Sequence, residues 1–349
     1  MNATKARATI TDVALEAGVH PSTVSRVLNG HAESTIRPAT RERVLAAADR
    51  LGYRPSALAR SLRLQRTLTL GMLVPDITNP FFSSIIKGAE DAALERGYNL
   101  ILCNSEDDPA REAAYLRVLR ERQVDGLLIA SSQMADDTIA ELREEDFPFV
   151  LLNRAAQGAG DLAVVVDNHA AAVGVVAHLA ALGHRRVGHI AGPQNTTTGV
   201  DRREGYRAGV LACGLADEPE LVVEADAFSE EAGQRALGIM LAGPARPTAV
   251  FAANDLIAIG MLQRLRRIGA HVPGDLSIVG FNDIPLAGLL EPALTTVRVP
   301  QLAMGVAGAH LLIDRLEGRP IGDVRLTLPT ELVIRASSAA PSAPEGSPQ

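Results

Sequence analysis

The chain has 349 residues and is 47% hydrophobic, enough to bury the cores of two or three domains. No apolar run reaches the roughly 18 residues of a membrane span, and the polar N-terminus has no segment typical of a secretion signal. The net charge of −7 is unevenly distributed, because residues 1–66 hold 11 Lys and Arg against 5 Asp and Glu. A basic head on an acidic body fits nucleic-acid binding confined to the head.

Residues 9–31 have the pattern of two short helices joined by a tight turn at residues 18–20. The apolar positions on one face of each helix are Val13, Ala14 and Ala17, followed by Val24, Val27 and Leu28. This pattern predicts a helix-turn-helix whose second helix is free to enter a DNA major groove. A third helix is expected from about residue 38 to residue 51, because Pro38 suits a first helical turn and Gly52 ends the apolar stripe.

A short segment follows at residues 55–63, which begins with proline and contains no β-branched residue. A helix of this length is marginal in water on its own. We therefore expect a hinge helix that is ordered only when something packs against it. The predicted organisation is a helix-turn-helix domain at 1–54 and a hinge helix with linker at 55–66.

From Leu68 onward, short apolar strands alternate with amphipathic helices. Strands are expected at 69–74, 99–103, 126–130, 149–152, near 164, and at 187–191, 221–223, 249–252 and 277–281. Repeated strand-helix units imply parallel sheets with helices on both faces, so the fold class is α/β. Two such series imply two lobes, with a ligand cleft where the carboxyl ends of their strands face each other.

The body predicted in this way covers residues 67–335. The tail at 336–349 is rich in Ser, Ala and Pro and is predicted to be disordered. Cys103 and Cys213 lie far apart in the sequence and are expected to be buried free thiols.

Eight segments in this order resemble the lactose-repressor (LacI/GalR) family of bacterial transcription regulators, from residue 9 to about residue 335. They are the helix-turn-helix, Tyr-Arg-Pro-Ser-Ala-Leu-Ala-Arg-Ser-Leu at 53–62, Val-Pro-Asp-Ile-Thr-Asn-Pro-Phe-Phe at 74–82, Arg-Gln-Val-Asp-Gly-Leu-Leu at 122–128, Val-Asp-Asn at 166–168, Gly-His-Arg-Arg-Val at 183–187, Ser-Ile-Val-Gly-Phe-Asn-Asp at 277–283 and Pro-Ala-Leu-Thr-Thr-Val at 292–297.

The resemblance implies a three-helix head, a hinge helix and a body like that of periplasmic binding proteins. In such a body the first lobe is expected at about 67–166 and 299–325, and the second lobe at about 167–298 and 326–335. The resemblance also implies a homodimer that represses transcription by binding a palindromic operator, with a small carbohydrate-like effector bound between the lobes. Effector and DNA would be coupled because the effector shifts the spacing of the two hinges. Such a regulator is expected in the bacterial cytoplasm, at the nucleoid, with no membrane partner, no cofactor and no metal.

The resemblance places Pro21, Ser22 and Arg26 where the recognition helix faces bases. Arg26 can donate two hydrogen bonds to O6 and N7 of a guanine, and the alternative is a contact with a backbone phosphate. Ser22 can donate or accept, so it predicts little. His20 stands where a short hydroxyl usually caps the helix, and its ring is a poorer cap, which the preset φ of Pro21 can offset. Residues better placed for backbone phosphates are Thr11, Thr23, Ser25 and Asn29.

Leu62 lies where the family has an apolar wedge in the minor groove at the operator centre. Paired wedges from two subunits would unstack one base step and kink the DNA. The alternative is that Leu62 only packs against the partner's hinge. Arg60 and Arg63 flank it and can neutralise phosphates.

Polar and aromatic residues follow the strand ends of the body, where they can bind a hydroxyl-rich ligand. The candidate effector contacts are Asp76, Asn79, Phe82, Arg154, Asp167, Arg202, Phe228, Asn254 and Asp255. Aromatic rings at Phe82 and Phe228 can pack on the apolar face of a sugar, and the resemblance implies effector contacts by Arg202 and Asp255. Two arginines in one cleft would also allow a carboxylate or a phosphate. For Asn282 and Asp283 the sequence allows two roles, contact with the ligand or hydrogen bonding within a turn or helix cap. Phe81 is expected in the core.

Other functions find less support in the sequence. A transport-type sugar-binding protein would share the two-lobed body but lack the head and hinge. An enzyme with a DNA-binding appendage would need a nucleophile and its base, and no such constellation stands out. The glycine pattern at 158–163 precedes a strand, so it cannot cradle a dinucleotide phosphate. The three histidines at 178, 184 and 189 lack zinc-ligand spacing.

Overall fold

A computed structural model describes residues 8–28, 36–54, 66–158, 160–322 and 325–342. Residue contacts divide the chain into two compact units, Met1–Thr67 and Leu68–Gln349. None of the helices within the described ranges is long and apolar enough to cross a membrane.

Within residues 8–28 and 36–54, the described part of the first unit forms the helices α1 (Ile10–Ala17), α2 (Pro21–Leu28) and α3 (Pro38–Arg50). A capping box begins α1, since the Thr9 side chain accepts from the Asp12 amide while Asp12 accepts from the Thr9 amide. Gly18, with φ of 63°, ends α1 in the left-handed conformation and lets the chain turn into α2. The core is that of the predicted helix-turn-helix: Val13, Ala14, Ala17, Val24, Val27, Val44, Ala47 and Ala48. The predicted hinge helix lies outside the described residues.

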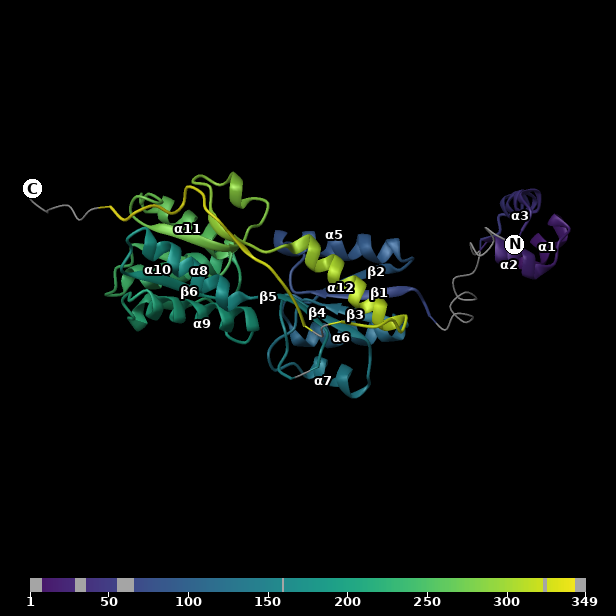
Figure 1. Ribbon diagram of the computed structural model, residues 1–349, viewed down its shortest axis with the longest axis horizontal. Coiled ribbons are helices and arrows are strands. Elements are labelled where there is room, and N and C mark those ends of the chain that lie inside the picture. Colours follow the sequence, from purple (N-terminus) through teal and green to yellow (C-terminus); the bar gives the residue numbers. More distant parts are fainter. Residues whose placement is uncertain (1–7, 29–35, 55–65, 159, 323–324, 343–349) are drawn as a thin grey trace, which may run out of the picture. The chain divides into compact units, whose positions relative to one another are not determined.

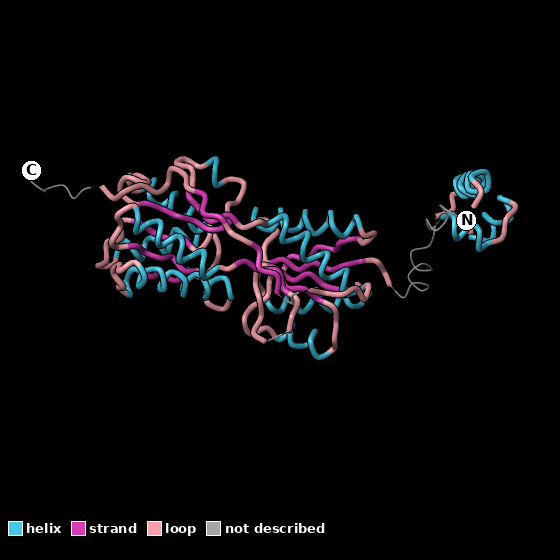
Figure 2. Tube along the Cα trace, viewed as in Figure 1, coloured by secondary structure: helices cyan, strands magenta, loops and turns pink. Residues whose placement is uncertain are grey.

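The second unit consists of two lobes, each a six-stranded sheet with helices on both faces (Figures 1 and 2). The first sheet has the strand order β11-β5-β4-β3-β1-β2, and every pairing in it is parallel. Its strands are β1 (Thr69–Val74), β2 (Asn99–Asn104), β3 (Gly126–Ile129), β4 (Phe149–Leu152), β5 (Ala163–Val166) and β11 (Arg325–Leu328). The helices of this lobe are α5 (Pro80–Glu95), α6 (Pro109–Glu121), α7 (Asp137–Glu144) and α12 (Gln301–Leu316).

The second sheet has the order β12-β10-β9-β8-β6-β7, and only its pairing of β10 with β12 is antiparallel. Its strands are β6 (Val187–Ala191), β7 (Val222–Glu224), β8 (Ala249–Ala252), β9 (Ser277–Asn282), β10 (Thr295–Arg298) and β12 (Glu331–Val333). Its helices are α8 (Asn168–Ala181), α9 (Thr197–Ala212), α10 (Glu230–Ala242) and α11 (Asp255–Arg267), and short 3₁₀ turns occur at Pro219–Leu221 and Ala287–Leu289.

The chain passes between the lobes three times, after β5, after β10 and after β11. The last crossing is the yellow segment that runs from one lobe to the other in Figure 1. The sequence placed this crossing at 325–326. In the structure it lies after Leu328, because the whole of β11 pairs with β5 in the first sheet.

Helices α5 and α12 pack against each other through two glycines. A Cβ atom on Gly305 would lie 2.0 Å from the carbonyl oxygen of Ile85, and one on Gly88 would lie 2.2 Å from that of Leu302. No side chain fits at either distance, so the two backbones touch only because both residues are glycine. This contact fixes α12, which comes from the C-terminal third of the chain, onto the first lobe.

The prediction of a disordered tail from residue 336 is wrong for its first part. Ser337 is fully buried, its backbone carbonyl accepts from the Ile278 amide, and its hydroxyl donates to the Ile278 carbonyl at 2.6 Å. Ala339 continues the attachment, since its amide donates to the Ser277 hydroxyl. Backbone and hydroxyl pairing to β9 holds this segment despite its Ser- and Ala-rich composition. Residues 343–349 lie outside the described ranges.

Candidate functional site

The predicted DNA contacts within the described residues all belong to the first two helices. They are Thr11 on α1 and Pro21, Ser22, Thr23, Ser25 and Arg26 on α2. Ser22 and Arg26 are exposed, whereas Val24 and Val27 on the opposite face are buried in the head. Asn29, Arg60 and Leu62 lie outside the described residues. The exposed face of α2 therefore presents the polar side chains that the sequence assigned to DNA.

The start of α2 is held by the His20 side chain. The Ser22 amide donates to His20 Nδ1 at 3.3 Å, and the Ser22 hydroxyl lies 2.8 Å from the same nitrogen. The imidazole nitrogen thus accepts a hydrogen bond from the first turn of α2, as the hydroxyl of Ser or Thr does at other helix starts. Pro21, the first helical residue, has no amide hydrogen that would need a partner.

A cavity of about 620 Å³ lies between the two lobes of the body. All the predicted effector residues line it except Asp167 and Asp255. First-lobe residues reach it from the loop after β1, from the start of α5 and from the loop after β4. Second-lobe residues reach it from α9 and from the loops that precede α10 and α11. The predicted residues that line it are Asp76, Asn79, Phe82, Arg154, Arg202, Phe228 and Asn254.

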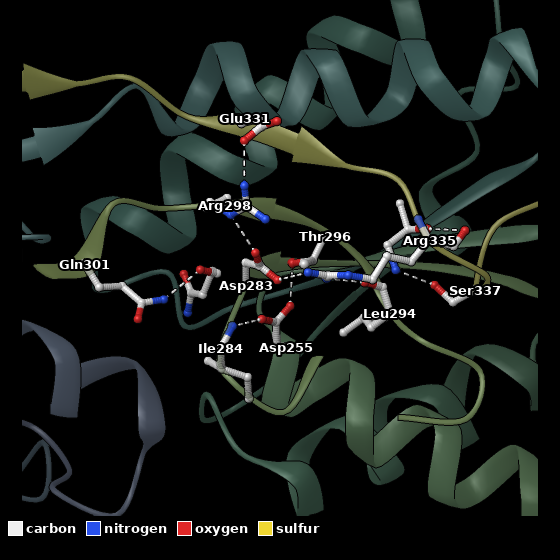
Figure 3. Close-up of polar contacts among 12 residues, drawn as sticks. Asp255, Asp283, Ile284, Leu294, Thr296, Arg298, Gln301, Glu331, Arg335 and Ser337 are labelled. Carbon is white, nitrogen blue, oxygen red and sulfur yellow. Dashed lines mark hydrogen bonds and ion pairs between the residues drawn. The ribbon is translucent and has the colours of Figure 1, made fainter. Parts of the chain in front are cut away.

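Asp167 and Asp255 are engaged elsewhere. Asp167 caps α8, where its carboxylate accepts from the Ala170 amide at 2.8 Å. Asp255 is fully buried, and its two oxygens accept from the Thr296 hydroxyl at 2.6 Å and from the Ile284 amide at 2.8 Å (Figure 3). Burial raises the pKa of Asp255 to about 7, against the effect of these two hydrogen bonds. Its carboxyl thus holds Ile284 and Thr296 together and does not line the cavity.

Arg202 projects from α9 into the wall of the cavity and is 2% exposed. Its Nε donates to the Asn168 side chain at 2.9 Å, and its Nη1 donates to the Ala253 carbonyl at 2.6 Å. Its guanidinium lies 3.8 Å from the centre of the Phe281 ring. Burial lowers the pKa of Arg202 to about 9, so it remains charged at neutral pH. Neutral partners fix the group on one side and leave it free to donate to a ligand.

Arg154 has a different environment, although it lines the same cavity. Its Nη1 pairs with Asp107 at 2.6 Å and donates to the Ser131 carbonyl at 3.3 Å. Its guanidinium carbon lies 5.7 Å from the centre of the Phe228 ring. Since Arg154 belongs to the first lobe and Phe228 to the second, this contact bridges the cavity. The ion pair with Asp107 neutralises Arg154, so the two cavity arginines are not equivalent anion sites.

The cavity wall also holds residues that the sequence left open or missed. For Asn282 the sequence allowed either a ligand contact or a role in a turn, and the residue lines the cavity. Its backbone has a φ of 117°, and its carbonyl accepts from the Gln301 side chain. Asp283 next to it instead bridges Arg298 and Arg335 at 2.8 and 2.7 Å (Figure 3). Phe81 lines the cavity while being only 2% exposed. Polar residues that the sequence analysis missed are Thr78, Asn104, Glu106, Asp107, Gln133, Asn195, Thr196, Thr198, Asp226 and Ser229.

Only some of the cavity residues that were not predicted could have been recognised from the sequence. Asn104 ends β2 and follows an apolar strand, as the predicted ones do. Thr196 and Thr198 lie at the start of α9, where hydroxyl residues also occur simply as caps, and Thr196 does cap α9. Their place in the cavity follows from how the second lobe faces the first.

Within the described part of the chain, no group of three His, Cys, Asp or Glu side chains is arranged to hold a metal ion. His189 is fully buried between the rings of Tyr206 and Phe251, and its Nδ1 lies 2.9 Å from the Phe251 carbonyl. Burial lowers the pKa of His189 to about 3, so its ring is neutral. His184 lies within hydrogen-bond distance of Thr248 and the Ala339 carbonyl.

A buried carboxyl near the cavity makes stability depend on pH. Glu112 on α6 is 6% exposed, and burial together with the charge of Asp136 raises its pKa from 4.5 to about 7. The folded state therefore binds this proton more tightly than the unfolded state. The stabilisation is full below pH 4.5 and is lost as the pH rises to about 7.

We expect Glu112→Gln to remove this loss, so the variant gains stability relative to wild type between pH 5 and pH 8, by on the order of 3 kcal/mol. Urea unfolding at the two pH values measures the difference. Glu121→Gln, at the exposed end of the same helix, is the matched control. If the Glu112→Gln and wild-type stabilities ran parallel with pH, the carboxyl would not carry the effect.

Comparison with known proteins gives matches over both units. A family model described as "Bacterial regulatory proteins, lacI family" matches residues 9–56, and one described as "Periplasmic binding protein-like domain" matches residues 176–338. The HTH-type transcriptional repressor CytR of Escherichia coli is 36% identical over 333 residues, covering 95% of this chain and 97% of that protein. The ribose operon repressor of Halalkalibacterium halodurans is 36% identical over 330 residues, with 95% and 97% covered.

Solved structures give the same result. The complex of the transcriptional regulator CelR with cellobiose has a TM-score of 0.72 and 35% identity, covering 95% of this chain and 100% of that one. A LacI family transcriptional regulator from Enterococcus faecium with bound ribose has a TM-score of 0.69 and 31% identity, with 78% and 99% covered. Because relatives at 36% identity span nearly the whole chain, and the head and the two-lobed body match theirs, this chain belongs to the lacI family of bacterial regulatory proteins and is a DNA-binding transcriptional regulator.

Proposed function

We propose that the protein is a repressor that binds a palindromic operator as a homodimer and whose operator affinity is controlled by a small neutral carbohydrate in the interlobe cavity. The observation that carries this proposal is the cavity itself, where a buried, neutrally held Arg202 faces the same space as Asn79, Asn254 and three phenylalanines. Sugar hydroxyls need both donors and acceptors, and the aromatic rings suit their apolar faces. The relatives solved with cellobiose and with ribose support a sugar as ligand.

The charges around the cavity favour a neutral sugar over a sugar acid or sugar phosphate. Arg154 is already paired with Asp107. Asp76, Glu106 and Asp226 add further carboxylates to the lining. An anionic ligand would meet one available guanidinium, that of Arg202, among several negative charges, so we expect it to bind more weakly than the corresponding neutral sugar.

A thermal-shift screen tests the effector class. The probes are ribose, glucose, galactose and cellobiose, each beside its acid or phosphate where one exists. A ligand at 100 times its Kd adds about 2.7 kcal/mol of stability, which is readily seen as a rise in Tm. Neutral sugars should give the larger shift. A panel in which only the anionic compounds shift Tm would overturn the charge argument, and a panel without any shift would contradict a sugar effector.

Arg26 is the residue of α2 on which we expect operator recognition to depend most. In a selection from a random duplex library with the full chain, Arg26→Ala should lose the preference for one guanine per half-site, by about 5- to 150-fold. If Arg26 contacts a phosphate instead, affinity falls evenly across sequences and the salt dependence becomes shallower. Arg50→Ala, at an arginine of α3 that pairs with Glu16, is the control.

The dimer is proposed to form in part along β2, which lies at the edge of the first sheet. Ile101 and Leu102 on this strand are 38% and 41% exposed, and Leu94 at the end of α5 is 66% exposed. An edge strand with exposed apolar side chains is suited to pairing with a second copy of the chain.

We expect Leu102→Glu to raise the dimer dissociation constant at least about tenfold, because the charge would be buried without a partner. Analytical ultracentrifugation over a dilution series measures it. Leu211→Glu, at an exposed leucine of α9, should leave assembly unchanged. Equal effects of the two substitutions would place the interface elsewhere.

A regulator of this kind acts where the chromosome is, so we assign it to the bacterial cytoplasm. It is proposed to bind its effector without converting it. Incubation of the sugars that shift Tm with the pure protein should return them unchanged, whereas turnover would favour an enzyme with a DNA-binding head.

A further inference from the structure

The recognition helix of this chain begins with an unusual pair of side chains, His20 and Ser22. The Ser22 amide donates to His20 Nδ1 at 3.3 Å, and Ser22 Oγ lies 2.8 Å from the same atom. Both residues are exposed, as is Arg26 one turn further along α2. The pair therefore lies on the surface that the proposed function assigns to the operator.

The two contacts determine which ring nitrogen carries the proton. A backbone amide can only donate, so Nδ1 must be the unprotonated nitrogen if it is to accept from Ser22. The positive end of the α2 dipole also favours a lone pair at this position over an N–H. A neutral His20 ring accordingly carries its hydrogen on Nε2.

The same assignment fixes the Ser22 hydroxyl. A serine hydroxyl has one hydrogen and two lone pairs, so a free serine can either donate to a base or accept from one. Here Nδ1 has a single lone pair, which the Ser22 amide at 3.3 Å and the Ser22 hydroxyl at 2.8 Å share as a three-centre hydrogen bond, so the hydroxyl hydrogen is directed to Nδ1. Ser22 Oγ is then left with lone pairs alone on the side that faces away from His20.

We propose that His20 is a positioning residue that makes Ser22 an acceptor-only reader, selective for bases with an exocyclic amino group in the major groove. Those bases are adenine, through N6, and cytosine, through N4, whereas guanine and thymine present O6 and O4 acceptors there. The inference rests on the proposed binding of operator DNA by α2. It gives a specific meaning to a serine that would otherwise be compatible with any base.

The test is a selection from a random duplex library with the full chain and four variants. Ser22→Ala identifies the operator position that Ser22 reads, as the one position whose preference it removes. Wild type should prefer adenine or cytosine there over guanine or thymine by about 5- to 150-fold. His20→Ala should bring that preference close to unity at the same position and leave the Arg26 position unchanged.

Two further variants separate positioning from helix capping. His20→Asn offers a side-chain oxygen that can accept from both the Ser22 amide and its hydroxyl, so the preference should return. His20→Lys has no acceptor and should behave like His20→Ala. A cap that only stabilises the helix would instead weaken all sequences in parallel, with the base preference unchanged, and this result would overturn the proposal. The proposal would also be overturned if affinity fell equally for all sequences and depended less steeply on salt, because that result would indicate a phosphate contact by His20.

The tautomer can be checked without DNA. In the full chain labelled with ¹⁵N-histidine, the signals missing in His20→Asn belong to His20, and their shifts report which nitrogen is protonated. We expect Nε2–H, and an Nδ1–H tautomer would refute the proposal. If wild type enriched no sequence at all, the proposed operator binding would fail. An enriched operator whose Ser22 position is insensitive to His20 would refute only the present inference.

Discussion

Arg202→Met is expected to abolish the effector response, with at least a hundredfold loss of sugar affinity. The guanidinium is buried in the cavity wall, and hydrogen bonds to a charged group are worth about 1.5–3 kcal/mol each. The substitution removes every donor that Arg202 can offer a ligand. It also leaves the Asn168 side chain and the Ala253 carbonyl without this partner, so the cavity wall loses order as well.

Isothermal titration with the sugar that gives the largest wild-type thermal shift measures this loss. The matched control is Arg203→Met, because Arg203 is the next residue of α9 and contacts Gln194 and Glu224 instead of lining the cavity. Arg203→Met should bind sugar within a few-fold of wild type. Operator affinity measured without sugar should equal that of wild type in both variants. An Arg202→Met protein that still bound sugar normally would exclude Arg202 as a contact.

Gly305→Ala is expected to destabilise the protein by about 3 kcal/mol or more, which is at the upper end of overpacking effects. The added methyl would lie 2.0 Å from the Ile85 carbonyl oxygen, and the obstacle is backbone, which cannot rotate away. Helix α12 would have to move away from α5, and this movement would also disturb its packing on the first sheet. Urea unfolding measures the free energy of unfolding, and a fall in soluble yield would accompany it.

Gly174→Ala is the same chemical change in the opposite environment. Gly174 lies in α8 with no atom within 4 Å of its would-be Cβ. Because alanine is the better helix former, this variant should gain up to about 1 kcal/mol. Opposite signs for the two glycines are therefore predicted. Loss of stability in both would mean that helical glycines in this chain are required for a reason other than close packing.

Much of the fold could be predicted from the sequence because its strands are uninterrupted apolar runs. The predictions for 69–74 and 149–152 agree with β1 and β4 residue for residue. Helix α6 begins at Pro109 behind the Asp108 cap, although its first turns lack the apolar stripe that would predict a helix there. Helix α7, which is short and mostly polar, was not predicted.

The predictions that failed depended on partners far away in the sequence. Asp255 follows an apolar strand just as Asn254 does, but its oxygens are taken by Thr296 and Ile284, some 30 to 40 residues later. Composition predicted disorder at Ser337, whereas β9 and Thr295 supply its hydrogen bonds. Local pattern indicates that a residue is polar and near a strand end. It does not indicate whether that residue faces the ligand or supports the wall behind it.

The three crossings between the lobes also have a consequence for biosynthesis. The first sheet is completed only by β11 at Arg325–Leu328, and the second only by β12 at Glu331–Val333. The head, by contrast, draws its core from Val13 to Ala48. On the ribosome, the DNA-binding head can fold while the rest is being made, but neither sensor lobe can close before almost the entire chain has emerged. A transcript or ribosome that stops early would therefore release a DNA-reading head with no finished sensor.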